Sequence, residues 1–157
     1  MSELTVLTEP NAELRKKSKS VKPEDVQSTE ILSLISDLKE TMVVENGIGI
    51  AAPQVGVHKK IIIIGIGDDP QAFINPKVVS RSFRKVVSEE GCLSIPGVYG
   101  MVKRSRKVKV EALNEDGDEV TLNAEGLSAV VLQHEIDHLS GILFIDKVRE
   151  FTNRPRM

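Results

Sequence analysis

The sequence is poor in the residues from which disulfides and metal sites are built. It contains one cysteine, Cys92, and three histidines, His58, His134 and His138. A single cysteine excludes an intramolecular disulfide and indicates a protein of a reducing compartment. Because so few histidine and cysteine side chains are present, there are few ways to build a metal site or a catalytic base from them.

Long hydrophobic runs and an excess of one charge are also absent. The longest apolar run, residues 61–66, is far shorter than the roughly 20 residues that cross a bilayer. The amino terminus has no signal-peptide pattern. With 21 basic and 23 acidic residues and a net charge of −2, no overall basic field attracts nucleic acid. We therefore expect a cytoplasmic protein with no membrane or DNA partner, formed as a single domain over residues 1–157.

Periodic patterns predict a chain of the α+β class. The predicted elements are a short helix over 11–17, a helix over 28–44, a strand over 60–66, a short strand over 73–79 interrupted by Pro76, a hairpin of 106–113 with 120–124, and a helix over 125–140. These elements follow apolar spacing, β-branched runs and turn signals. Since the last helix has apolar residues on two faces, we expect it to be buried at the centre.

The strongest chemical signal is the segment 134–138, which reads His-Glu-Ile-Asp-His. Histidines at positions i and i+4 lie on one helix face, so the rings of His134 and His138 can reach one divalent metal. The neighbouring Glu135 can act on a metal-bound water. A third ligand is then needed.

The third ligand has two upstream candidates, His58 and Cys92. Phe144 stands where an extended motif would place a third histidine, and few acidic residues follow the motif. A thiolate with two imidazoles and a water is a known catalytic geometry. A lone cysteine can instead be an inert buried residue or a nucleophile with a histidine base.

A glycine-rich segment, residues 47–54, reads Gly-Ile-Gly-Ile-Ala-Ala-Pro-Gln. It superficially matches a dinucleotide-binding loop, but a predicted helix precedes it and Pro53 blocks a helix after it. Two interpretations stay open. The segment is a structural turn, or it is a backbone rail for an extended peptide with Gln54 as a side-chain donor.

Taken together, three segments resemble the peptide deformylase family. They are residues 47–54, residues 90–94 (Glu-Gly-Cys-Leu-Ser) and residues 134–138, in the order the family has them. The resemblance extends from about residue 6 to residue 144. It implies small antiparallel sheets around a central buried helix that carries the His-Glu-x-x-His motif. It also implies removal of the N-formyl group from the N-terminal formylmethionine of newly synthesised polypeptides, with release of formate.

The resemblance also implies a role for each site residue. Cys92, His134 and His138 bind one metal ion per chain, and Glu135 is the general base and acid for the water that attacks the formyl carbon. Gln54 and the backbone N–H of Leu93 hold the developing oxyanion. The implied substrate-binding residues are Ile48, Gly49, Gly91, Leu127, Val130 and Val131. Arg104 is expected to pair with Glu90.

By the same resemblance, the expected metal is Fe²⁺, with Zn²⁺, Ni²⁺ or Co²⁺ in some preparations. The expected partners are nascent formyl-Met polypeptides, with transient ribosome contact, and the expected state is a monomer. The chain departs from the family at two places. Residues 97–100 stand where members often carry a peptide-binding arginine, and the chain ends at Met157 where many bacterial relatives continue into a helix associated with ribosome docking.

Two other functions compete with deformylation. A metallopeptidase of the His-Glu-x-x-His type would need a third histidine at Phe144 or a downstream glutamate. After the motif, the chain offers only Asp146 and Glu150. A binding module with a structural metal would need four protein ligands, whereas Glu135 stands beside an open position.

Overall fold

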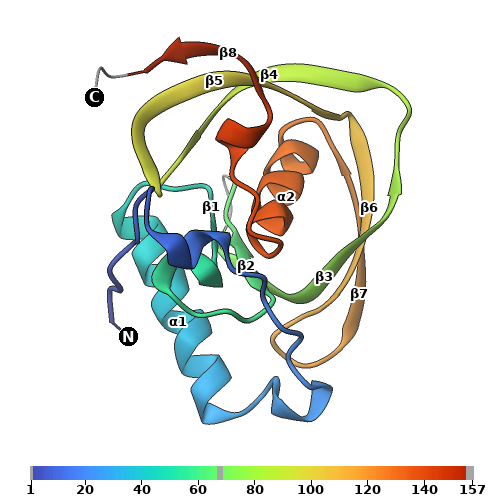
Figure 1. The fold of residues 1–157 in the computed structure, drawn as a ribbon. Coiled ribbons are helices and arrows are strands. Elements are labelled where there is room, and N and C mark those ends of the chain that lie inside the picture. The colour runs from blue at the N-terminus through green and yellow to red at the C-terminus, as the bar shows by residue number, and fades with distance from the viewer. Residues whose placement is uncertain (1, 67–68, 155–157) are drawn as a thin grey trace.

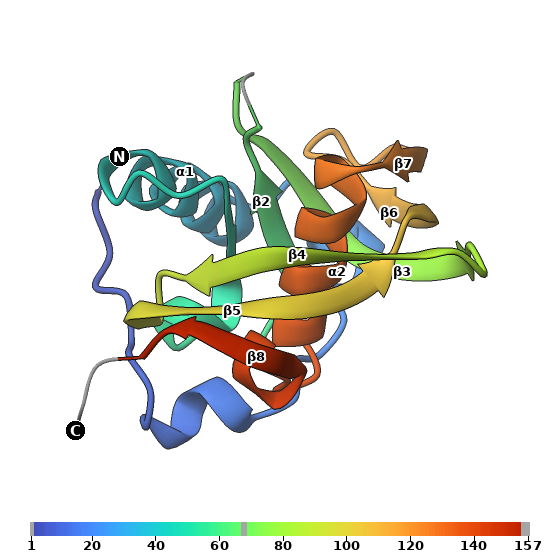
Figure 2. The same ribbon diagram turned by 90° about the horizontal axis from the view of Figure 1, so that it is seen from above.

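The computed structural model describes residues 2–66 and 69–154 of the chain. Over these residues, two α-helices and two antiparallel sheets form an α+β fold (Figure 1). The second helix lies in the middle, with strands of both sheets around it, as Figures 1 and 2 show. The fold class expected from the sequence is confirmed.

Helix α1, Thr29–Val44, occupies the predicted span. Its first turn is capped by Ser28, whose hydroxyl accepts a hydrogen bond from the backbone N–H of Ile31 at 3.3 Å. Such caps satisfy amide groups that have no partner within the helix. The helix buries its apolar face, Ile31, Ile35, Leu38 and Met42, in a core shared with strands β1 and β2.

The larger sheet has the strand order β1-β2-β3-β6-β7. Its strands are β1 (Gly49–Ala51), β2 (Ile61–Ile64), β3 (Gln71–Arg81), β6 (Lys107–Leu113) and β7 (Glu119–Glu125). The predicted hairpin is β6 with β7, paired in continuous register. The predicted interruption at Pro76 is wrong. Strand β3 continues through it with a register shift between Ile74 and Lys77, where a residue without an N–H is tolerated.

The smaller sheet has the order β4-β5-β8 and was not predicted from the sequence. Its strands are β4 (Lys85–Cys92), β5 (Ile95–Ser105) and β8 (Val148–Asn153). In Figure 2 these strands lie across helix α2. Residues 148–153 thus form an edge strand where many relatives are expected to continue into a helix, and residues 155–157 lie outside the described part of the chain.

Helix α2, Leu127–His138, is buried along most of its length, as predicted. It ends before Gly141, which has a φ of 73°, a conformation that favours glycine. Short 3₁₀ turns complete the fold: η1 (Ala12–Arg15), η2 (Pro23–Asp25), η3 (Ala52–Val55) and η4 (Phe144–Asp146). The first of these falls within the predicted helix 11–17. Within the described residues, no helix combines the length and apolar character needed to span a membrane.

Candidate active site

Three side chains from two elements meet at one point beside helix α2. Cys92 ends β4, and His134 and His138 lie one turn apart on α2. One ligand atom from each lies within 4.8 Å of the others, and the Cys92 sulfur is 3.4 Å from Nε2 of His138. Ligands around one tetrahedral ion at about 2.0–2.3 Å are roughly 3.5 Å apart. The donor set and its spacing therefore fit a transition-metal ion.

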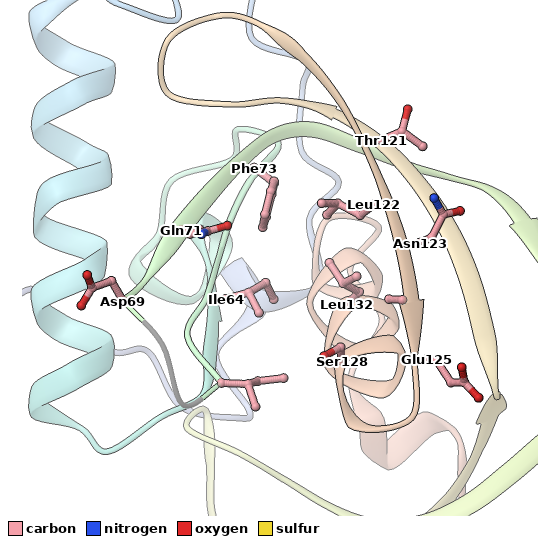
Figure 3. A pocket seen from close by; sticks show the side chains of 12 residues that line it. Ile64, Asp69, Gln71, Phe73, Thr121, Leu122, Asn123, Glu125, Ser128 and Leu132 are labelled. Carbon is pink, nitrogen blue, oxygen red and sulfur yellow. The ribbon is translucent and has the colours of Figure 1, made fainter.

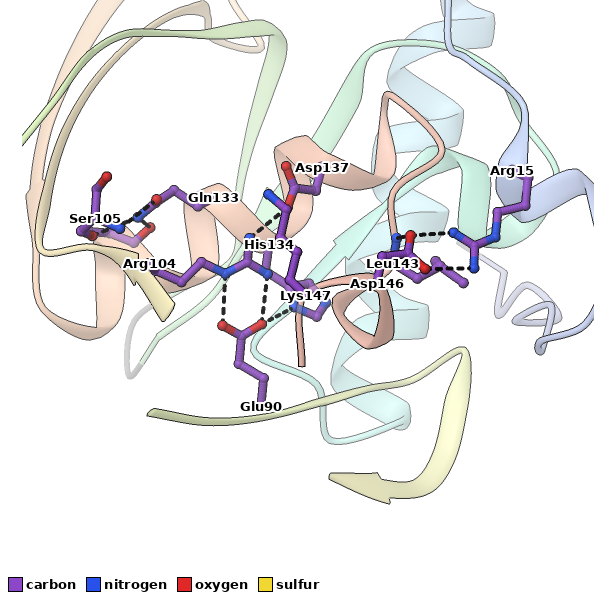
Figure 4. A network of polar contacts seen from close by, with 11 residues as sticks. Arg15, Glu90, Arg104, Ser105, Gln133, His134, Asp137, Leu143, Asp146 and Lys147 are labelled. Carbon is purple, nitrogen blue, oxygen red and sulfur yellow. Dashed lines mark hydrogen bonds and ion pairs between the residues drawn. The ribbon is translucent and has the colours of Figure 1, made fainter. Parts of the chain in front are cut away.

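A buried ion network orients His134. Nδ1 of His134 donates to Oε1 of Glu90 at 2.8 Å, which leaves Nε2 available as a ligand. Two nitrogens of Arg104 each donate to Glu90 at 2.9 Å, and a third donates to Asp137 at 2.6 Å (Figure 4). Hydrogen bonds of this kind fix the ring orientation of metal-binding histidines. The expected pairing of Arg104 with Glu90 is present, whereas the role of Asp137 was not anticipated.

The network shifts the proton affinities of its members. Burial alone would raise the pKa of Glu90, but the hydrogen bonds from Arg104 and His134 lower it to about 2. Burial opposes the charged form of His134, yet hydrogen bonds with Cys92 and Glu90 raise the pKa of its ring. Glu90 is thus a permanent carboxylate acceptor for the histidine.

Glu135 is buried beside the cluster and holds a free carboxyl oxygen. Its exposed fraction is 4%, and its Oε1 has no hydrogen-bond partner among the described residues. Burial raises the pKa of Glu135 to about 7. Strand β1 passes so close that a Cβ on Gly49 would lie 2.5 Å from Oε2 of Glu135. Only glycine leaves room for the carboxylate at this position.

Like Glu135, His138 has a buried side-chain atom without a hydrogen-bond partner among the described residues. This atom is Nδ1 of the ring. Burial lowers the pKa of the His138 ring, which favours the neutral form that binds metals. The ring is completely enclosed.

Gln54 presents its amide donor to the cluster. Its carbonyl oxygen accepts from the N–H of Ala51 at 2.9 Å, so the amide orientation is fixed. Its Nε2 then donates to Oγ of Ser94 at 3.1 Å and lies 3.6 Å from the Cys92 sulfur. Ser94 was not among the predicted site residues, although it lies in the cysteine segment that carries the resemblance.

A cavity of about 670 Å³ opens onto this cluster. It is lined by every predicted site residue except the enclosed His138: Ile48, Gly49, Gln54, Gly91, Cys92, Leu93, Leu127, Val130, Val131, His134 and Glu135. Among these residues, Val130 and Val131 are buried, whereas Ile48 and Leu127 are about half exposed. The structure therefore brings all the predicted residues to one place.

Tyr99 also lines the cavity and was not predicted as a site residue. Its ring lies against Gly91, where a Cβ would approach Cε1 to 2.5 Å. It belongs to the stretch 97–100, where the resemblance implied a peptide-binding arginine in many relatives. Only its position shortly after the cysteine segment could have indicated Tyr99, because nothing in the neighbouring sequence identifies it as a site residue.

The other candidate ligands lie elsewhere. Nε2 of His58 is 2.9 Å from the backbone oxygen of Glu13. Asp146 forms an ion pair with Arg15 at 2.5 Å (Figure 4). Phe144 stacks on the ring of His134, with 6.1 Å between centroids. Among the described residues, Cys92 is thus the side chain that joins the two histidines.

A second cavity of about 380 Å³ lies between β2, β3, β7 and α2 (Figure 3). It is lined by the apolar side chains of Ile64, Phe73, Leu122 and Leu132 together with several polar side chains. It contains no cysteine or histidine, and it uses residues of α2 that do not line the first cavity. The candidate metal-binding and catalytic side chains therefore belong to the first cavity and not to this one.

A thiolate and two imidazoles, next to a carboxyl that faces a cavity, define the class of metal-dependent hydrolases with a His-Glu-x-x-His helix. Comparison with known proteins narrows this class. The sequence profile of the polypeptide deformylase family matches residues 3–154. The chain belongs to this family.

Individual relatives agree with this assignment. The chain is 50% identical over 144 residues to a peptide deformylase of Acetivibrio thermocellus, which covers 92% of this chain and 82% of that protein. The actinonin complex of the Ehrlichia chaffeensis enzyme superposes with a TM-score of 0.90 at 39% identity, covering 94% and 90% of the two chains. The Met-Ala-Ser complex of the Acinetobacter baumannii enzyme gives 0.90 at 33% identity, covering 94% and 100%.

Proposed function

We propose that this protein is a peptide deformylase that removes the formyl group from the N-terminal formylmethionine of new polypeptides and releases formate. The observation that carries the proposal is the cluster of Cys92, His134 and His138 beside the unpaired carboxyl of Glu135. The match to the deformylase family over residues 3–154 supports the substrate class. A metallopeptidase is not favoured, because Phe144, Asp146 and Glu150 supply no further ligand.

The proposed ligands are the sulfur of Cys92 and Nε2 of His134 and His138, with one metal ion per chain. Thiolate and imidazole donors suit Fe²⁺ as well as Zn²⁺. The family resemblance favours Fe²⁺ in the cell, with Zn²⁺, Ni²⁺ or Co²⁺ in some preparations. When bound, the metal supplies a Lewis acid and lowers the pKa of a coordinated water.

Glu135 is proposed to move the protons. Its carboxylate accepts a proton from the water that attacks the formyl carbon, and later delivers that proton to the departing amine. A pKa raised to about 7 by burial suits both tasks, because acid–base catalysis works best when the pKa is close to the working pH. Its free Oε1 leaves one position available for the water.

Gln54 and Leu93 are proposed to stabilise the charge that develops on the formyl oxygen. The amide donor of Gln54 is directed toward the cluster by its bond to Ala51, and the backbone N–H of Leu93 follows directly after Cys92. Donors held in place before the reaction stabilise an oxyanion at little reorganisation cost.

The cavity is proposed to hold the methionine side chain and the peptide that follows. Val130 and Val131 offer buried apolar surface to it, and Ile48 and Leu127 offer half-exposed apolar surface. The backbones of Ile48, Gly49 and Gly91 are proposed to pair with the peptide as a strand does. A tight space beside the metal is proposed to admit the formyl hydrogen and to reject the methyl group of an acetyl chain.

The proposed setting is the bacterial-type cytoplasm, where formylated chains are made. The protein is proposed to act as a monomer and to contact the ribosome transiently. Its single, unpaired cysteine supports a reducing compartment. Sedimentation equilibrium tests the monomer, since a mass near 17.3 kDa is expected.

Formate release from formyl-Met-Ala-Ser tests the proposal directly. Protein prepared without oxygen should contain one metal per chain and turn over this peptide, while acetyl-Met-Ala-Ser should react far more slowly. Comparable rates with both peptides would contradict the proposed selectivity. Protein that binds no metal at all would overturn the site assignment.

Replacing Glu135 with Gln separates proton transfer from metal binding. The variant keeps the size of the side chain and all three ligands, so its metal content should not change. Its kcat should fall by about 10²–10⁴-fold because the general base is lost. A variant with wild-type kcat and full metal content would exclude Glu135 as the base.

A further inference from the structure

An exposed surface with an aromatic residue and several basic residues lies at the turn that joins β3 to β4. Phe83, in the middle of this turn, is fully exposed to solvent. Figure 2 shows the turn projecting from the body of the molecule at the right-hand edge. An aromatic side chain in that position contributes nothing to the core and is free to contact a partner.

Basic side chains surround this aromatic residue. Two backbone hydrogen bonds tie the turn to the β5–β6 connection: Ser82 N–H to the oxygen of Lys107 at 2.9 Å, and Arg106 N–H to the oxygen of Arg84 at 3.0 Å. We call the resulting surface the basic tip and define it as Arg81, Phe83, Arg84, Lys85, Arg106 and Lys107.

The charge of the basic tip is only weakly compensated. Glu125, on the neighbouring β7, lies 3.3 Å from Arg106 and 4.0 Å from Lys107. Arg81 and Arg84 are exposed and form no ion pair with any described residue. In a chain whose net charge is −2, the tip is thus a local concentration of positive charge.

We propose that the basic tip docks on single-stranded RNA. The arginines and lysines would contact phosphates, and Phe83 would stack on an unpaired base. Cationic side chains combined with aromatic stacking are a common means of binding single-stranded nucleic acid. The identity of the RNA rests on the proposed function, because a deformylase meets its substrates as they leave the RNA-rich ribosome.

The chemistry of the tip favours RNA over a lipid surface. Amphipathic helices that bind membranes bury a whole apolar face, whereas Phe83 is the one apolar residue of the basic tip. Its arginines present planar donors that match phosphate oxygens in pairs. Electrostatic attraction of the basic residues to acidic lipid would not require an aromatic side chain.

The position of the tip allows docking and catalysis at the same time. Strand β4 runs from Lys85 at the tip to Cys92 in the cavity. Seven residue steps along a strand cover about 23 Å. An RNA bound at the tip would therefore leave the cavity open to a peptide.

Fluorescence anisotropy of the full chain with a labelled single-stranded RNA tests the proposal. Binding should weaken steeply between about 50 mM and 200 mM salt. The double variant Arg81→Glu with Arg84→Glu should bind at least about tenfold more weakly. Phe83→Ala should lower affinity for the single strand about tenfold and leave affinity for a duplex of the same sequence nearly unchanged.

A matched control is available in the N-terminal segment. Lys17 and Lys22 are exposed, and their double replacement by Glu changes the net charge by the same amount. This control should retain RNA binding, and all the variants should hydrolyse formyl-Met-Ala-Ser at wild-type rates. Loss of RNA binding with normal hydrolysis would therefore support the tip separately from the deformylase activity.

Three results would overturn the proposal. The wild-type protein could fail to bind RNA at about 50 mM salt. The Arg81 and Arg84 variant could bind as tightly as the Lys17 and Lys22 control. Vesicles of phosphatidylserine with phosphatidylcholine could bind the wild type where RNA does not, which would assign the tip to a membrane surface.

Discussion

At the scale of single residues, the site depends on buried polar atoms that have no partner within the protein. Oε1 of Glu135 and Nδ1 of His138 are both of this kind among the described residues. Leaving such an atom unpaired costs about 1–3 kcal/mol. A stable fold tolerates that cost where the atom has a partner in the reaction, as proposed for Glu135. Substitution of such residues is therefore the most direct test of the proposed function.

Gln54 offers a prediction at this scale. Gln54→Met retains the length of the side chain but removes the amide donor directed at the cluster. Its kcat for formyl-Met-Ala-Ser should fall by about 10²–10³-fold, because a lost oxyanion donor acts in the transition state. KM should change little. Steady-state kinetics at a temperature far below unfolding measures both values.

Gln71→Met is the matched control for this prediction. Gln71 is exposed on β3 and does not line the catalytic cavity. It should have wild-type kinetics. A Gln54→Met enzyme as active as this control would show that the amide does not stabilise the oxyanion.

At the scale of elements, the site is a junction of β4, β5 and α2. Arg104 of β5 connects Glu90 of β4 with Asp137 of α2, and its side chain is only 2% exposed. A buried ion pair contributes little net stability, but removing one partner leaves an unpaired buried charge. The junction should therefore be sensitive to the loss of a single member.

Arg104→Met should lower the free energy of unfolding by about 3–5 kcal/mol, because the Glu90 charge stays buried. Urea denaturation measures the difference. Lys103→Met is the control on the same strand, with an exposed side chain, and should change stability by less than about 0.5 kcal/mol. Equal stability of the two variants would mean that the network does not support the fold.

The pair of Arg15 and Asp146 ties η1 to η4 and predicts a dependence on pH. The hydrogen bond from Arg15 lowers the pKa of Asp146 against a smaller opposing effect of burial. A lowered pKa in the folded state stabilises the protein above the unfolded pKa, about 3.9. That contribution is lost as the pH falls through the folded value.

Asp146→Asn should therefore be less stable than the wild type at neutral pH, and the difference should shrink toward zero as the pH falls below about 4. Urea midpoints at a series of pH values provide the measurement. Glu150→Gln, at an exposed position on β8, should show no such convergence. A gap between Asp146→Asn and wild type that stays constant down to low pH would contradict the pairing.

At the scale of the whole molecule, helix α2 joins both sheets into one body. One apolar cluster packs α2 against the five-stranded sheet, and Glu90 and Arg104 of the smaller sheet bind His134 and Asp137 of α2. Since both sheets depend on one helix, we expect residues 1–157 to unfold as a single catalytic domain. Equal calorimetric and van't Hoff enthalpies would support this expectation.

Metal removal should lower the stability of the whole molecule. A metal at 100 times its dissociation constant adds about 2.7 kcal/mol, so chelation should lower the thermal midpoint by about 5–10 °C. Glu135→Gln should show the same fall because it retains the ligands. His134→Ala, which lacks one, should show almost none. A wild-type thermal midpoint that does not change when the metal is chelated would contradict a stabilising metal site.

Local sequence determined the elements whose signals lie within a few residues. The apolar spacing of α1, the hairpin of β6 with β7, and the two histidines of α2 follow from periodicity alone. The small sheet could not be predicted from periodicity, because the buried charged residues Glu90 and Arg104 break the alternation of apolar and polar residues in β4 and β5. Strand β8 depends on pairing with β5, a contact between distant segments.

The site residues likewise divide into those that the local sequence determined and those that only the tertiary structure decided. Spacing by itself selected His134, Glu135 and His138, because one helical turn places i and i+4 on the same face. Spacing left His58 and Cys92 open as the third ligand, and ligand chemistry together with the resemblance of the three segments to the deformylase family favoured Cys92. The tertiary structure decided between them, since the end of β4 meets α2 at Cys92 while His58 lies against η1. Such meetings depend on how whole elements pack, and that information is distributed along the chain.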